Sequence, residues 1–199
     1  MSRKMIRAVL SLALLAFAPL VFAGPKLGNY AIDPSHSKVG FEIGHLVISS
    51  VEGRFRDFNG TMMLTSKGPQ VKVVVDVASI NTEEPRRDKH LRSPDFFDVA
   101  KFPTMTFENT KVTGDINKNF ELHGTLNLHG VSRPLVLKMT FLGQAKDPWG
   151  TMRYAYKATG TLNRKDFGLN WNKVVEVGPL VGDEVQLSLK LELLPSKAK

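Results

Sequence analysis

Five basic side chains lie within seven consecutive positions of the sequence, shortly before two adjacent phenylalanines, Phe96 and Phe97. Arginine suits phosphate and carboxylate groups, because its planar guanidinium donates two parallel hydrogen bonds to such an anion. The segment therefore combines groups that could hold an anionic head with groups suited to an apolar wall. The basic residues are Arg86, Arg87, Lys89, His90 and Arg92.

The same cluster also has a purely structural interpretation. The charged residues would then form the solvated face of a short helix, with Asp88 pairing internally. Leu91, Phe96 and Phe97 would fill the core beneath that helix. For the individual charges the residue types favour this interpretation, and for the two phenylalanines they leave both interpretations open.

Other catalytic or metal-binding patterns have little support. The five histidines are spaced wrongly for a compact zinc site, so we expect no metal. Ser35 and His36 are neighbours, and neighbours on a strand point to opposite faces, so they cannot form a nucleophile–base pair. The G-x-S-x-G, H-E-x-x-H and P-loop motifs are absent from the sequence. We expect neither catalysis nor a cofactor.

The first 23 residues have the organisation of a secretory signal peptide. A basic start precedes an apolar run over residues 8–22, and a small-residue cleavage site ends at Ala23. The run is too short and wrongly flanked for a stable membrane anchor. The sequence therefore predicts an exported protein whose mature domain occupies residues 24–199.

Composition narrows the class of protein further. The chain has 199 residues, a formal net charge of +8 and no cysteine. A single domain of this length can bury a substantial core, and it must do so because no disulfide is available. The charge is not the dense basic stripe of a nucleic-acid binder, so no nucleic-acid partner is expected.

Apolar and polar residues alternate along most of the chain, which is the period of a β-strand. Several of the expected strands exceed ten residues, a length more typical of a coiled antiparallel barrel than of a sandwich. The sequence therefore predicts an all-β, antiparallel barrel of about eight strands. The expected strands cover residues 30–44, 53–65, 70–80, 102–113, 119–129, 133–145, 151–163 and 183–194.

Helix signals are few, and one or two short helices are expected. Thr82 is a suitable N-cap for a helix that continues to about Leu91. Ser93 and Pro94 offer a second start for a single turn over 95–98. A third helical turn is expected near 45–50. The cluster at 86–97 thus forms the main interruption of a β chain.

A closed barrel of this size is either filled by side chains or holds one small ligand. Residues 24–199 contain ten phenylalanines, and glycines fall inside several expected strands. A glycine within a strand marks a bend or a place where something approaches the backbone closely. The residue types alone leave a filled core and a ligand cavity equally open.

Several phrases of the sequence occur in an order and spacing that resemble a known family. The phrases are YAIDPSHS (30–37), VGFEIGHL (39–46), GRFRDFNG (53–60), SINT (79–82), RDKHLRS (87–93) with DFF (95–97), FP (102–103), DPWG (147–150), GTLNLHGV (124–131) and DFG (166–168). This series is similar to the YceI-like family of polyisoprenoid-binding periplasmic proteins, and the resemblance covers essentially the whole mature chain.

The resemblance implies a lipocalin-like barrel whose long apolar pocket takes a polyisoprenoid, such as an isoprenoid quinone or a polyprenyl phosphate, or another long amphiphile. It also implies a periplasmic location, no enzymatic activity and, in several members, a homodimer. An inner-membrane redox protein is a further expected partner. The expected ligand-binding residues are Phe41, His45, Phe55, Phe58, His90, Leu91, Arg92, Phe96, Phe97, Phe107 and Phe167.

Two hypotheses from other classes stay open at this point. The first is an enzyme acting on a lipid or small amphiphile, with carboxylates and histidines near the mouth as its acid–base groups. The second is a barrel filled by side chains that acts as a stress-response interaction module and binds no lipid.

Overall fold

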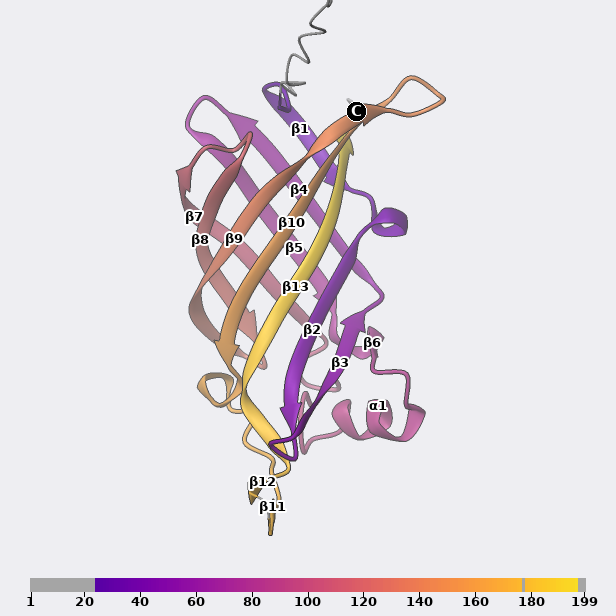
Figure 1. Ribbon diagram of the computed structural model, residues 1–199, viewed down its shortest axis with the longest axis vertical. Coiled ribbons are helices and arrows are strands. Elements are labelled where there is room, and N and C mark those ends of the chain that lie inside the picture. The colour runs from indigo at the N-terminus through magenta and orange to yellow at the C-terminus, as the bar shows by residue number, and fades with distance from the viewer. Residues whose placement is uncertain (1–23, 177, 197–199) are drawn as a thin grey trace, which may run out of the picture.

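One large antiparallel sheet dominates the structure, a computed structural model that describes residues 24–176 and 178–196 (Figure 1). Eight of its strands close into a barrel, because the last strand pairs with the first. In barrel order they are β1 (Gly28–Ile32), β4 (Phe58–Thr65), β5 (Gly68–Asp76), β7 (Thr104–Gly114), β8 (Asn119–Leu128), β9 (Val131–Lys146), β10 (Met152–Asn163) and β13 (Val181–Pro195). The predicted all-β barrel of about eight antiparallel strands is confirmed.

Three further strands continue the sheet past β13: β2 (Lys38–His45), β3 (Ser49–Phe55) and β6 (Ile80–Asn81). Strand β13 changes partner along its length, since Leu193 pairs with Ile32 of β1 and Leu187 pairs with Phe41 of β2. The barrel is thus closed through β1 at one end. At the other end β2, β3 and β6 lie beside the helix α1 (Pro85–Leu91) (Figure 1).

Three strands that the sequence predicts as continuous are broken. The predicted strand 70–80 ends as β5 at Asp76, and Ile80 pairs with β3 as part of β6. The predicted strand 30–44 is interrupted by the 3-10 helix η1 (Pro34–His36). Pro34 has no backbone N–H for a ladder, and the Asp33 carboxylate accepts a hydrogen bond from the Ser35 backbone N–H. The predicted strand 53–65 breaks at 56–57, because β3 pairs with β2 whereas β4 pairs with β1 and β5.

The helix begins later than predicted. Glu84, not Thr82, is the N-cap of α1, and its carboxylate accepts hydrogen bonds from the backbone N–H groups of Arg86 and Arg87. Thr82 is buried instead, where its backbone N–H and its hydroxyl both donate to Asp88, at 2.8 and 2.6 Å. Asp88 therefore does pair internally, with a threonine rather than with a basic residue.

Other local predictions are corrected as well. The expected helical turn near 45–50 is wrong, because Leu46 and Val47 adopt positive φ values of 53° and 67° in a tight turn between β2 and β3. The segment from Ser93 forms hydrogen-bonded turns rather than a helix. Further short elements are η2 (Val77–Ser79), η3 (Arg164–Phe167) and a hairpin of β11 (Val174–Val175) and β12 (Gly178–Pro179).

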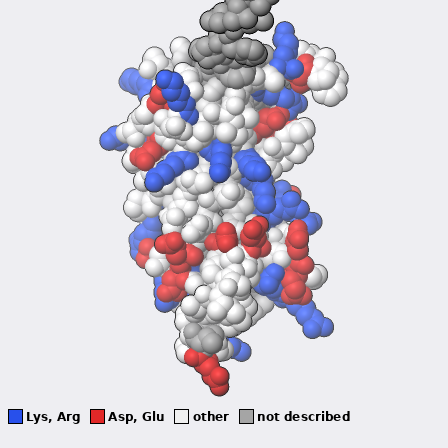
Figure 2. Space-filling model, viewed as in Figure 1, with Lys and Arg blue, Asp and Glu red and all other residues white. Residues whose placement is uncertain are grey.

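Charged side chains of both signs spread over the face shown in Figure 2, without forming one continuous basic stripe there. Among the described residues, no helix has the length and apolar character needed to cross a membrane. The predicted signal peptide, residues 1–23, lies outside the residues that the structure describes.

Candidate ligand-binding cavity

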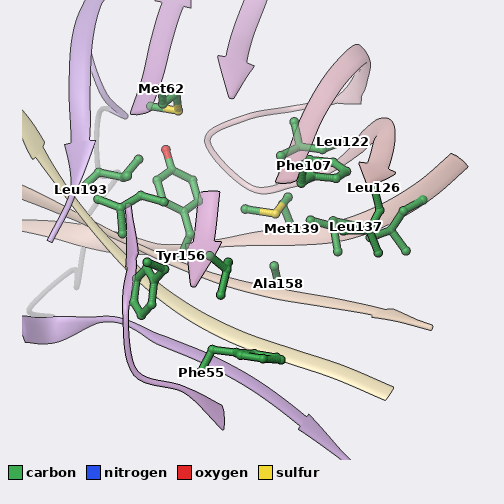
Figure 3. Close-up of a cluster of buried hydrophobic side chains, with 14 of the residues drawn as sticks. Phe55, Met62, Phe107, Leu122, Leu126, Leu137, Met139, Tyr156, Ala158 and Leu193 are labelled. Carbon is green, nitrogen blue, oxygen red and sulfur yellow. The ribbon is translucent and has the colours of Figure 1, made fainter. Parts of the chain in front are cut away.

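The barrel encloses an apolar cavity of about 540 Å³, a volume within the usual range for small-molecule sites. Its walls are inward-facing side chains of the long strands, among them Val73 of β5, Phe107 of β7, Leu122 of β8 and Leu137 of β9. Figure 3 shows several of these side chains converging from different strands. The two alternatives for the barrel interior are thereby decided in favour of a cavity.

One strand glycine that could have marked a ligand contact has a packing role instead. A Cβ atom added to Gly124 would lie 2.6 Å from the ring of Phe107 and 2.4 Å from the Glu108 carbonyl oxygen. Gly124 therefore makes room for the Phe107 ring, which in turn forms part of the cavity wall.

The cavity brings together most of the residues that the sequence nominates. Three of the nominated residues, Phe58, Phe167 and Arg92, are not part of its lining. The nominated residues that do line it are Phe41, His45, Phe55, His90, Leu91, Phe96, Phe97 and Phe107.

The three residues outside the lining have structural contacts. Phe58 and Phe167 are buried in the hydrophobic core, with 5% and 2% of their surface exposed. The Arg92 guanidinium donates to the backbone carbonyl oxygens of Ala78 and Ile80, at 2.7 and 2.8 Å. Arg92 thus ties α1 to η2 and β6, and its prediction as a ligand contact is not supported by this geometry.

Aromatic rings form one side of the cavity at the α1 end. The rings of His90 and Phe96 have centroids 5.0 Å apart, and Trp171 lies 5.1 Å from His90 and 4.9 Å from Phe96. His90 Nε2 also lies 2.9 Å from a carboxylate oxygen of Asp95. Trp171 is not among the residues that the sequence nominates, because it lies in an irregular segment where no period indicates which way a side chain points.

Three arginines line the same end of the cavity, and two of them are held by the protein itself. Arg87 donates to the hydroxyl and the carbonyl oxygen of Thr82, at 2.7 and 2.8 Å. Arg164 is buried and donates to backbone carbonyl oxygens, including that of Gly182 at 2.7 Å. Among the described residues, the Arg86 guanidinium has no such partner, so Arg86 is the rim arginine available to an anion.

A possible metal site occurs elsewhere, at Asp33, His36 and Glu192, whose ligand atoms lie within 4.8 Å of one another. Arg153 Nη1 already lies 2.7 Å from Asp33 and 2.5 Å from Glu192. Burial raises the pKa of Asp33, but hydrogen bonds to His36 and Arg153 outweigh it and hold that pKa well below its usual range. Because the Arg153 guanidinium neutralises these carboxylates, this cluster of three residues does not favour the binding of a metal cation.

A closed antiparallel barrel, an apolar internal cavity and a rim of aromatic and arginine side chains together define a ligand-binding β-barrel. The chain belongs to the YceI family, since it matches the YceI-like domain over residues 30–193. The family membership that the sequence phrases predict is confirmed.

Individual relatives agree with this assignment. A UPF0312 protein of Pseudomonas paraeruginosa is 40% identical over 189 residues, which cover 92% of this chain and 96% of the relative. The crystal structure of the Campylobacter jejuni YCEI protein is similar with a TM-score of 0.67 and 31% identity, covering 83% of this chain and 96% of that one.

A polyisoprenoid binding domain from Saccharophagus degradans has the same fold at a lower identity. Its TM-score is 0.63 at 17% identity, covering 84% of this chain and 98% of that one. This likeness shows the fold alone.

Proposed function

We propose that the protein is a periplasmic binding or carrier protein for a long-chain isoprenoid lipid, whose apolar part lies in the barrel cavity. The observation that carries the proposal is the cavity itself, which is walled almost throughout by aliphatic and aromatic side chains. Burying each methylene of a tail contributes about 0.8 kcal/mol, so a long tail supplies substantial affinity even after ordering costs.

Two further observations support this proposal. The structurally similar domain from Saccharophagus degradans is a polyisoprenoid binding domain. The sequence pattern of residues 1–23 supports export to the periplasm. An inner-membrane redox partner and a homodimer stay predictions of the sequence.

Two kinds of isoprenoid lipid fit this proposal, polyprenyl phosphates and isoprenoid quinones, and they differ in their head groups. A polyprenyl phosphate must keep its charged phosphate at the rim, because burying an unpaired charge in an apolar cavity is very costly. Arg86 lies at the rim to receive such a group. An isoprenoid quinone carries no charge, so its ring can enter the cavity.

Extraction of the protein from its native compartment tests the proposal. The mature protein, purified from its own periplasm, is extracted with organic solvent and the extract is analysed by mass spectrometry. We expect isoprenoid lipid in near-stoichiometric amount. An empty extract, together with no uptake of added quinone or polyprenyl phosphate, would contradict the proposal.

Arg86→Ala is expected to weaken binding of a polyprenyl phosphate about threefold to tenfold at low ionic strength, since it removes one charge-assisted contact at an exposed rim. Binding of a neutral quinone should be unchanged. The matched control is Lys89→Ala, on the same helix but outside the cavity lining. Binding is measured by titration at two salt concentrations. Equal losses of affinity in the two variants would show that Arg86 does not contact the phosphate.

A further inference from the structure

The hydroxyl of Tyr156 is a polar group in the apolar part of the cavity. Tyr156 lies on β10 opposite Phe141 of β9 and Leu191 of β13, lines the cavity and is only 4% exposed. Figure 3 shows its ring among apolar side chains, with the hydroxyl directed to the side where Met62 is drawn.

The surroundings of the Tyr156 ring are aromatic and apolar. The Tyr156 ring packs at 5.1 Å from Phe141 and 5.9 Å from Phe120, measured between centroids. The nearby Tyr30 differs, because its hydroxyl donates to the carbonyl oxygen of Lys26 at 2.7 Å. The hydrogen bonds found among the described residues do not include the Tyr156 hydroxyl, and this oxygen is not one of the fully enclosed polar atoms without a partner, so it faces the open space of the cavity.

A phenylalanine would give the same packing without burying a polar atom. A hydroxyl that faces an apolar cavity without a protein partner is one of the few polar groups that can orient a ligand there. Burial, and then the neighbouring Tyr30 and Tyr154, raise the pKa of Tyr156. The hydroxyl therefore stays protonated at neutral pH and can donate.

The position of Tyr156 decides which part of a ligand it can reach. Its partner Leu191 is two residues from Leu193, which pairs with Ile32 of β1 at the closed end of the barrel. The aromatic group of His90, Phe96 and Trp171 lies at the other end, beside α1. The exposed lining residue Arg86 marks a rim at that α1 end, so a ligand atom bonded to Tyr156 lies on the part of the ligand farther from this rim.

We propose that Tyr156 is a specificity-determining hydrogen-bond donor for a neutral carbonyl or ether oxygen at the buried end of the ligand. This inference rests on the proposed function and narrows its ligand class to an amphiphile that enters with its oxygen-bearing end first, as a quinone ring can. A polyprenyl phosphate would place only hydrocarbon beside Tyr156.

The test compares two probes that differ in acceptor oxygens, decylubiquinone and dodecylbenzene, by displacement of a bound fluorescent fatty acid. Tyr156→Phe should weaken the binding of decylubiquinone about threefold to tenfold, which is the effect of one neutral hydrogen bond. The binding of dodecylbenzene should be unchanged. Tyr154→Phe is the matched control, since Tyr154 lies on the same strand but outside the cavity lining, and it should change neither affinity. Unchanged binding of dodecylbenzene also shows that each variant is folded.

An unchanged ratio of the two affinities in Tyr156→Phe would overturn this inference while leaving the proposed function standing. Wild-type protein that binds neither probe would instead refute the proposed function, and the inference with it.

Discussion

Replacing Val73 by tryptophan should weaken lipid binding about 50-fold, whereas the same replacement at the adjacent Val74 should have little effect. Both residues lie on β5 and are partly buried, but only Val73 lines the cavity. Neighbours on a strand point to opposite faces, so the indole of the first variant enters the cavity and that of the second points away from it.

The magnitude follows from the volume that the indole takes from the ligand. If it displaces about three methylenes from the cavity, roughly 2.4 kcal/mol of burial is lost at about 0.8 kcal/mol each. The measurement is the amount of isoprenoid bound per protein and its dissociation constant, with thermal unfolding as a check that both variants fold. Wild-type binding by a folded Val73→Trp variant would place the lipid outside this cavity.

Arg164→Ala should lower the free energy of unfolding by about 2–4 kcal/mol, because it leaves buried carbonyl oxygens without a donor. The Arg164 guanidinium is buried and donates to the carbonyl oxygens of Leu169, Trp171 and Gly182. These contacts hold the segment that follows η3 against the start of β13. Urea unfolding measures the loss, and fluorescence of Trp171 should report a more solvated rim.

Lys165→Ala is the control for that prediction. Lys165 is the neighbouring residue and pairs with Asp183 at 2.7 Å, but both side chains are substantially exposed. Its loss should cost less than about 1 kcal/mol, as is usual for exposed ion pairs. Similar losses for the two variants would show that the Arg164 contacts do not organise the rim.

The sequence predicted the strands well where one face of a strand is apolar. The alternation of valines from 71 to 75 falls within β5, and that of leucines from 187 to 193 falls within β13, whereas Val77 already belongs to η2. Strand breaks were harder to predict. The interruptions at 34–36 and 56–57 arise because β13 exchanges β2 for β1 along its length, and nothing in the local pattern encodes that exchange.

The residues of the candidate site were also predicted in part. The sequence indicated that Phe96 and Phe97 turn inward, and both line the cavity. It could not separate Phe41, which lines the cavity, from Phe58, which fills the core, because both are phenylalanines in strands. That distinction depends on which strands face each other across the barrel.

By itself the sequence determined the class of fold, the family and the concentration of basic and aromatic residues next to an apolar barrel, because these follow from period, turns and phrase order. Only the tertiary structure decided what each polar side chain does there. Arg87 and Arg92 bond to backbone carbonyl oxygens, whereas Arg86 is left at the rim and the Tyr156 hydroxyl faces the cavity. Hydrogen-bond partners come from distant segments, so residue type cannot distinguish a structural arginine from one available to a ligand.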